Sequence, residues 1–352
     1  MVMNGIYLVI ASACILMLGY RFYGAFIAAK VLTLDQYRMT PAMVHNDGHD
    51  YVPTNKWVTF GHHFAAIAGA GPLVGPVIAA QFGYLPGTLW ILIGSVFAGA
   101  VHDMVILFAS IRYDGKSIAD ITREEISKIA GLGAMLATLF LLVITLAGMA
   151  VVVANALHNS AWAFFSVFAT IPIAIFIGIY LQWLRPGKIQ EATIIGVALI
   201  FAAIIYGPNI AASEYASWFI YDLKTIEIML AVYGFFAAAL PVWLLLAPRD
   251  YLSTYLKIGT IGALALGIII VMPEIQMPAV TDYIWGGGPV LKGSVFPYIF
   301  ITIACGALSG FHTVIATGTT PKMLTNEREV LPIGYGGMLT ESFISMMAMI
   351  AA

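Results

Sequence analysis

The chain has little charge and almost no cysteine. Charged residues make up 10% of its 352 residues, and its two cysteines are Cys14 and Cys305. Both lie within apolar runs, so the sequence offers neither a disulfide framework nor a CxxC metal-binding pair. The HExxH and GxSxG motifs of metallopeptidases and serine hydrolases are also missing. We therefore expect no enzyme, no metal site and no organic cofactor.

Apolar sequence is abundant instead. Hydrophobic residues make up 61% of the chain and the mean hydropathy is +0.93, more than a soluble core of this length could bury. Runs of about 17 to 25 apolar residues, the length that crosses a bilayer, predict an all-α integral membrane protein with about ten transmembrane helices. The predicted spans are Gly5 to Ala29, Trp57 to Phe82, Thr88 to Ile111, Leu132 to Leu157, Trp162 to Leu184, Ala192 to Tyr206, Ile226 to Leu246, Tyr255 to Met272, Phe296 to Ala316, and Ile333 to Ala352.

The basic residues give these spans an orientation. Of the sixteen lysines and arginines, all but Lys224 and Lys292 fall in loops on one side of the predicted topology. Basic loops mark the cytoplasmic side, so we expect the N-terminus to lie outside the cytoplasm. The net charge of -2 gives no reason to expect nucleic acid as a partner. Membrane lipids and a small-molecule substrate are the expected partners.

The second predicted span contains a cluster of helix breakers. Pro72 and Pro76 remove backbone donors within five residues, and glycines beside them relax the backbone. In lipid, broken backbone is tolerated only where protein or a water-filled cavity satisfies its polar groups. We therefore predict an unwound segment from Ala68 to Gly75.

This break is the predicted substrate site. The amides of a half-helix beginning near Gly71 would point into the gap with partial positive charge, which suits a carboxylate. A packing kink, in which small residues simply permit close helix contact, is the alternative. The residues expected at the site are His63, Gly69, Ala70, Gly71, Pro72 and Gly75.

A second break is predicted five spans later and in the opposite orientation. The run from Tyr233 to Pro248 contains Gly234 and Pro241, so we predict unwinding from Gly234 to Pro241 and place Pro241 in the substrate site. Two such helices indicate a five-plus-five inverted repeat, as in LeuT-like transporters. The single domain would comprise an extra helix (5–29), a first repeat (57–206) and a second repeat (226–352). A coincidental pair of kinks is the alternative, since both residue types are common in membrane helices.

Ionisable residues inside spans are candidates for ion coupling. His102 and Asp103 lie in the third span, and His312 lies in the ninth. Ser309, His312 and Thr313 are expected to share one face of the helix that forms the ninth span. We predict that these five residues couple transport to protons or Na⁺; interfacial anchoring or interhelical hydrogen bonding is the alternative. His63 is a further candidate proton carrier.

Three further features of the sequence give no specific prediction of function. Glu341 is an intramembrane carboxylate whose partner the sequence does not identify. The isoleucine spacing from Ser117 to Ile129 predicts a short amphipathic helix at the membrane surface, with a solvated connector as the alternative. The chain also ends within its last apolar run, so we expect further helices after Ala352.

Several segments resemble one known family, the carbon-starvation protein A family. They are Gly61-His62-His63-Phe64-Ala65-Ala66-Ile67-Ala68-Gly69-Ala70-Gly71-Pro72, Val101-His102-Asp103, Arg112-Tyr113-Asp114-Gly115-Lys116-Ser117-Ile118, Gly310-Phe311-His312-Thr313 and Thr319-Thr320-Pro321-Lys322. The resemblance implies a multi-pass transporter of the bacterial inner membrane, related to the amino acid, polyamine and cation transporter superfamily, that imports peptides or pyruvate with protons. A sodium-coupled symporter of the same fold, an ion channel or a sensory membrane module are the alternatives. The sequence leaves open the choice of substrate, the coupling ion and the oligomeric state.

Overall fold

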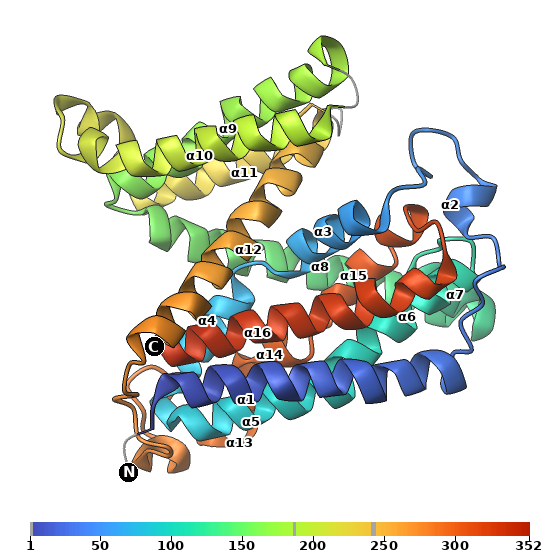
Figure 1. The fold of residues 1–352 in the computed structure, drawn as a ribbon, viewed down its shortest axis with the longest axis horizontal. Helices are drawn as coiled ribbons and strands as arrows, with labels where there is room; N and C mark the ends of the chain where they lie inside the picture. The colour runs from blue at the N-terminus through green and yellow to red at the C-terminus, as the bar shows by residue number, and fades with distance from the viewer. Residues whose placement is uncertain (1–2, 186–187, 241–243) are drawn as a thin grey trace. The chain divides into compact units, whose positions relative to one another are not determined.

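The computed structural model describes residues 3–185, 188–240 and 244–352. The chain forms two compact units, which we call unit 1 (Met1–Leu142 with Thr260–Ala352) and unit 2 (Val143–Gly259). Both consist of helices, as the apolar runs predict (Figure 1). Two long helices, α8 (Lys128–Leu157) and α12 (Leu246–Val271), contribute residues to both units.

The remaining helices divide between the units. The N-terminal part of unit 1 contains α1 (Gly5–Leu18), η1 (Gly19–Gly24), η2 (Ile27–Val31), α2 (Pro41–Val44), α3 (Lys56–Ile67), α4 (Gly71–Ala79), η3 (Ala80–Phe82), α5 (Tyr84–Gly94), η4 (Ser95–Gly99), α6 (Ala100–Arg112) and α7 (Ile118–Glu125). Its C-terminal part contains η7 (Asp282–Trp285), α13 (Val295–Thr302), α14 (Ala304–Ala307), α15 (His312–Ala316), η8 (Thr320–Lys322), η9 (Glu327–Glu329), η10 (Leu331–Tyr335) and α16 (Gly336–Ala351). Unit 2 contains α9 (Ala161–Ile179), η5 (Tyr180–Leu184), α10 (Ile189–Ala211), η6 (Glu214–Phe219) and α11 (Leu223–Ala239).

Six helical segments in the described part of the chain are long and apolar enough to cross a membrane. They are Gly5–Val31, Tyr84–Arg112, Lys128–Leu157, Ala161–Leu184, Gln190–Ala211 and Pro248–Val271. A bent pair, Lys56–Ile67 and Gly71–Phe82, adds a seventh if it counts as one span. These segments correspond to the first six and the eighth of the predicted spans. An all-helical membrane protein is thus confirmed, whereas the ten-helix inverted repeat stays a prediction.

The predicted break in the second span is present but shorter than expected. α3 ends at Ile67, α4 begins at Gly71, and the two helices are bent by 46°. Unwinding is therefore confirmed for residues 68–70 only. Pro72 lies in the first turn of α4, where its missing donor costs no hydrogen bond. A Cβ on Gly75 would lie 2.3 Å from the carbonyl oxygen of Thr302, which supports the packing alternative at that glycine.

Two predictions about later spans are wrong. α11 continues through Gly234 to Ala239, so the chain does not unwind at Gly234; a lone glycine weakens a helix by only about 1 kcal/mol. Pro241 lies outside the described residues. The ninth span is not one helix but three short ones, because Leu308 is extended and residues 308–311 separate α14 from α15. Ser309 therefore does not share a helix face with His312.

α16 forms the centre of unit 1. It packs against α1, α3, α4 and α5, and Figure 1 shows it beside α1. Its buried side chains include Ile344, Met346 and Met347, and in a membrane such side chains stabilise helix association through close packing. The same core buries the charged or ionisable side chains of Asp103, Glu341, His63, His312 and Glu327. Burying an unpaired charge costs several kcal/mol, so each of these residues needs a compensating partner.

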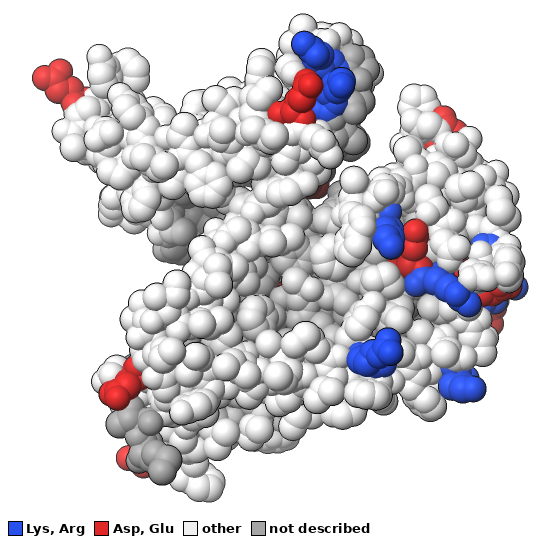
Figure 2. All heavy atoms as spheres, in the orientation of Figure 1, with Lys and Arg blue, Asp and Glu red and all other residues white. Residues whose placement is uncertain are grey.

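Basic side chains on the surface of unit 1 gather at the end that carries α2 and α7, with acidic ones among them, whereas only acidic ones are seen near the N-terminus at the opposite end (Figure 2). The gathering of basic side chains at one end agrees with the assignment of the basic loops to one side of a membrane. α7 confirms the predicted short helix, and Ser117 caps it by accepting a hydrogen bond from the Asp120 amide.

One carboxylate ties the loops of the basic end together. Glu327 is fully buried, and its Oε1 accepts hydrogen bonds from Arg112 Nη2 at 2.6 Å and from the Asp35 amide at 3.4 Å. Arg38 Nε lies 3.8 Å from Oε2. This role is hard to predict from sequence, because Asn326-Glu327-Arg328-Glu329 looks like an ordinary solvated loop.

We expect Glu327→Gln to destabilise unit 1. Neutralising the buried partner of Arg112 should cost about 1–3 kcal/mol, less than for a fully buried pair because Arg112 is 25% exposed. Thermal unfolding in detergent should show a midpoint several degrees lower. The matched control is Glu124→Gln, which breaks an exposed pair with Lys116 and should leave the midpoint unchanged. Equal midpoints for the two variants would contradict the assigned role of Glu327.

Candidate functional site

The centre of the candidate site is a hydrogen bond between two fully buried ionisable side chains. Asp103 comes from the first turn of α6, and His312 is the first residue of α15. Asp103 Oδ2 and His312 Nδ1 are 2.7 Å apart, and neither side chain is exposed. The contact joins residues 209 positions apart in the chain. The break before α15 thus places a histidine against α6 inside an apolar core.

Glu341 lies on the other side of the same imidazole. This carboxylate is on α16, its side chain is fully buried, and its Oε2 is 3.1 Å from His312 Nε2. These two atoms are close, but their geometry is not that of a hydrogen bond. Cys305 of α14 donates its thiol proton to Glu341 Oε1 across 3.2 Å. The structure therefore supplies the partner of Glu341 that the sequence could not identify, and it adds a cysteine that the sequence analysis passed over.

His102 extends the cluster toward its more exposed side. Its Nδ1 lies 2.9 Å from Asp103 Oδ1, and its Nε2 lies 3.0 Å from the hydroxyl oxygen of Thr313. The His102 side chain is 27% exposed, unlike the buried Asp103. Four of the five predicted coupling residues therefore meet in one network. Ser309 is also buried, but it lies in the extended segment before α15.

His63 is held in a separate polar contact. Its Nδ1 lies 2.9 Å from the hydroxyl oxygen of Thr320 in η8, and the residue is fully buried. Gly337 allows α16 to approach, since a Cβ there would lie 3.2 Å from Cδ2 of the imidazole. In this conformation His63 does not face an open cavity. Thr320 is a partner that only the tertiary structure reveals.

The other predicted substrate residues differ in exposure. Gly69 is exposed, Ala70 and Gly71 are half-buried, and Pro72 and Gly75 are buried. The break is thus accessible at Gly69, and the following helix α4 is buried at Pro72 and Gly75. The N-terminus of α4, at Gly71, lies at the accessible part.

The segments that carried the family resemblance converge in unit 1. Beyond the contacts of His63 and His312, Tyr51 donates its hydroxyl proton to the Asp114 carbonyl at 2.9 Å. The side chain of Lys322 donates a hydrogen bond to the Asp50 carboxylate at 2.8 Å. The backbone carbonyl of Lys322 accepts a hydrogen bond from the Val52 amide at 3.0 Å. The polar loop before α3 thereby joins the ends of α6 and η8, at the basic end of the unit.

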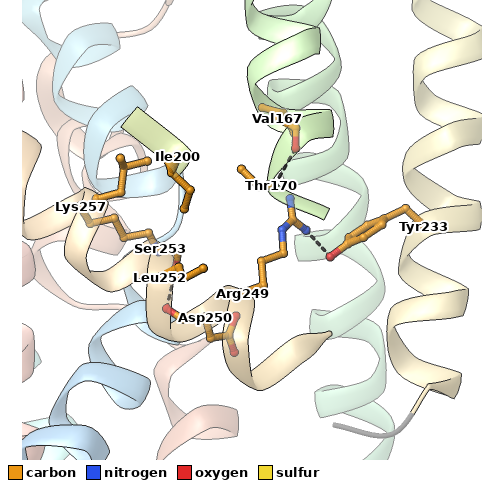
Figure 3. Close-up of a pocket in the computed structure, with 10 residues that line it drawn as sticks. Val167, Thr170, Ile200, Tyr233, Arg249, Asp250, Leu252, Ser253 and Lys257 are labelled. Carbon is orange, nitrogen blue, oxygen red and sulfur yellow. Dashed lines mark hydrogen bonds between the residues drawn. The ribbon is translucent and has the colours of Figure 1, made fainter. Parts of the chain in front are cut away.

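Unit 2 contains a separate polar pocket of about 250 Å³ (Figure 3). Arg249 enters it from α12 and donates to the hydroxyl of Tyr233, with its guanidinium carbon 4.6 Å from the centre of the Tyr233 ring. Asp250, Ser253 and Lys257 line the same pocket. In the sequence, Arg249 counts only as one of the basic loop residues. Its closeness to a predicted helix break was the one feature that could have marked it as part of a polar site.

The buried cluster has the groups needed to hold and pass a proton. One imidazole lies between two carboxylates, and a second imidazole connects this group to a hydroxyl. Histidine titrates near neutral pH, and ionisable groups at membrane depth usually mark ion or proton pathways. With its membrane-length helices and a bent span, the chain is a multi-pass helical membrane protein.

Comparison with known proteins then gives the family. The family profile described as carbon starvation protein CstA matches residues 4–352, and the chain belongs to this family. It is 57% identical over 351 residues to the peptide transporter CstA of Campylobacter jejuni, covering 99% of this chain and 50% of that protein. It is 52% identical over 352 residues to the pyruvate/proton symporter BtsT of Escherichia coli, covering 99% and 49%. The chain thus spans about half the length of the curated relatives it matches. No solved structure matches it.

Proposed function

We propose that the protein is a secondary active transporter that imports a peptide or pyruvate together with protons. The observation that carries this proposal is the buried Asp103–His312–Glu341 cluster, since three ionisable side chains in an apolar core are costly and are kept for function. The names of its relatives, peptide transporter and pyruvate/proton symporter, support the same reading. A proton fits this cluster better than Na⁺, which prefers oxygen ligands, because imidazole nitrogens occupy its centre.

The substrate carboxylate is placed at the broken second span. The partial positive charge at the N-terminus of α4, beginning at Gly71, suits an anionic group, and this end of the break is accessible. We also propose an inverted-repeat core in the bacterial inner membrane with the N-terminus outside the cytoplasm. The observed break at residues 68–70 and the basic end of unit 1 support this arrangement.

Uptake into proteoliposomes tests the proposed function. An inward proton gradient should drive accumulation of labelled pyruvate or of a dipeptide such as alanylalanine, and unlabelled substrate should saturate the uptake. An uncoupler should abolish accumulation, whereas replacing Na⁺ by K⁺ should not. Accumulation that requires Na⁺ would favour the sodium-coupled alternative. Flux that follows the electrochemical gradient without saturation would indicate a channel and contradict the proposal.

A further inference from the structure

Three potential metal ligands converge within the core of unit 1. Cys305 Sγ, His312 Nε2 and one carboxylate oxygen of Glu341 all lie within 4.8 Å of one another. Donor atoms bound to one zinc ion at about 2.0–2.3 Å are separated from each other by about 3–4 Å. The three atoms are therefore spaced so that a single ion can contact all of them after small side-chain adjustments.

Two of the three side chains also carry a buried donor atom without a hydrogen-bond partner. His312 Nε2 and Glu341 Oε2 are buried and lack a hydrogen-bond partner among the described residues. They lie 3.1 Å apart without pointing at each other as donor and acceptor would. Leaving such atoms without partners costs about 1–3 kcal/mol each. An ion between them would remove this cost.

Asp103 orients the histidine for coordination. Its carboxylate lies 2.7 Å from His312 Nδ1, so in the neutral imidazole the proton stays on Nδ1, and Nε2, 3.1 Å from Glu341 Oε2, keeps a free lone pair. In zinc sites, the histidine nitrogen that does not bind the metal commonly donates a hydrogen bond to a carboxylate. The cluster thus contains both the ligands and the group that fixes one of them.

The charge and softness of the ligands define the class of ion. When an ion binds, the Cys305 thiol loses its proton, and the resulting thiolate and the Glu341 carboxylate balance two positive charges. The ion and its ligands are therefore neutral together, and the remaining negative charge of Asp103 is met by its contacts with Nδ1 of His312 and Nδ1 of His102. Thiolate and imidazole select a borderline-soft ion such as Zn²⁺ over Mg²⁺ or Ca²⁺, which prefer oxygen ligands.

We propose that Cys305, His312 and Glu341 form a binding site for a Zn²⁺-like divalent cation, with Asp103 as the orienting carboxylate. Three protein ligands leave one coordination position open for water or another group. This proposal departs from the expectation of no metal, which considered only ligand spacing along the sequence. It does not rest on the proposed transport, although the ion would occupy the His312 nitrogen that proton coupling uses.

Co²⁺ binding to the purified protein tests the site. The protein should carry a purification tag without histidine, and binding should be measured without substrate or gradient. We expect one ion per chain, a near-ultraviolet thiolate-to-Co²⁺ absorption band, and displacement of Co²⁺ by Zn²⁺. Cys305→Ser should remove the band and weaken Zn²⁺ binding at least about a hundredfold. Cys14→Ser is the matched control and should leave both unchanged.

Further variants separate this site from adventitious binding and from transport. Asp103→Asn should keep the absorption band but weaken binding by about 10–100-fold, the usual effect of losing an orienting carboxylate. Serine can keep the hydrogen bond to Glu341, so Cys305→Ser should fold. No Co²⁺ binding, or a band that survives in Cys305→Ser, would overturn the metal site. Either result would leave the proposed transport untouched, because that is judged by gradient-driven uptake.

Discussion

We expect His312→Gln to abolish proton-driven accumulation while leaving substrate exchange intact. Glutamine keeps hydrogen bonding and approximate size, but it cannot take up a proton between two carboxylates. Substrate would then move down its own gradient without using the proton gradient. The accumulation ratio in proteoliposomes should fall to about one, whereas counterflow of labelled against unlabelled substrate should continue.

His49→Gln is the matched control for this substitution. His49 lies in the exposed loop before α3, away from the buried cluster, so the variant should accumulate substrate like the unmodified protein. Asp103→Asn neutralises the carboxylate that contacts His312 Nδ1 and should give the same phenotype as His312→Gln. If His312→Gln still concentrates substrate in response to an imposed proton gradient, coupling through this histidine is wrong. Glu341 would then be the next candidate.

The sequence identified most of the polar cluster because ionisable residues are conspicuous in apolar runs. His102, Asp103, His312 and Thr313 were singled out in this way, and the structure brings them into one network. Their number and chemistry follow from the sequence alone. Their pairing does not, because it depends on which helices meet across about two hundred residues of chain.

The missed features depend on tertiary contacts. Cys305 is an ordinary apolar residue until the chain brings it to Glu341. The ninth span has a membrane-length apolar composition, but the extended Leu308 divides it, and this division places His312 at the start of a new helix. Hydropathy measures composition and length, so it cannot show where a buried polar contact favours a break.

Glycine and proline marked a break at only some of the positions where they occur together, since Gly75-Pro76 lies inside α4 and Gly207-Pro208 lies inside α10. The cluster around Gly69, Gly71 and Pro72 marked a true break, since glycine precedes the new helix and proline fits its first turn. Gly234 stands alone within α11 and did not interrupt it. A single glycine costs the helix too little to unwind it, whereas a proline beyond the first turn also removes a hydrogen bond.

Gly71→Leu should abolish uptake while the protein stays folded in the membrane. Gly71 is half-buried at the N-terminus of α4, where the proposed carboxylate site needs close approach to backbone amides. A leucine side chain would displace the substrate by more than 1 Å, and a displacement of that size can cost a hundredfold in rate. Initial uptake should therefore fall at least about a hundredfold.

The control for this substitution is Gly133→Leu in α8, where a new side chain meets open space and uptake should be normal. Comparing thermal unfolding of the two variants separates a blocked site from a damaged fold. The expected result is similar unfolding midpoints with uptake lost only in Gly71→Leu. Normal uptake kinetics in Gly71→Leu would contradict a carboxylate site at the broken span.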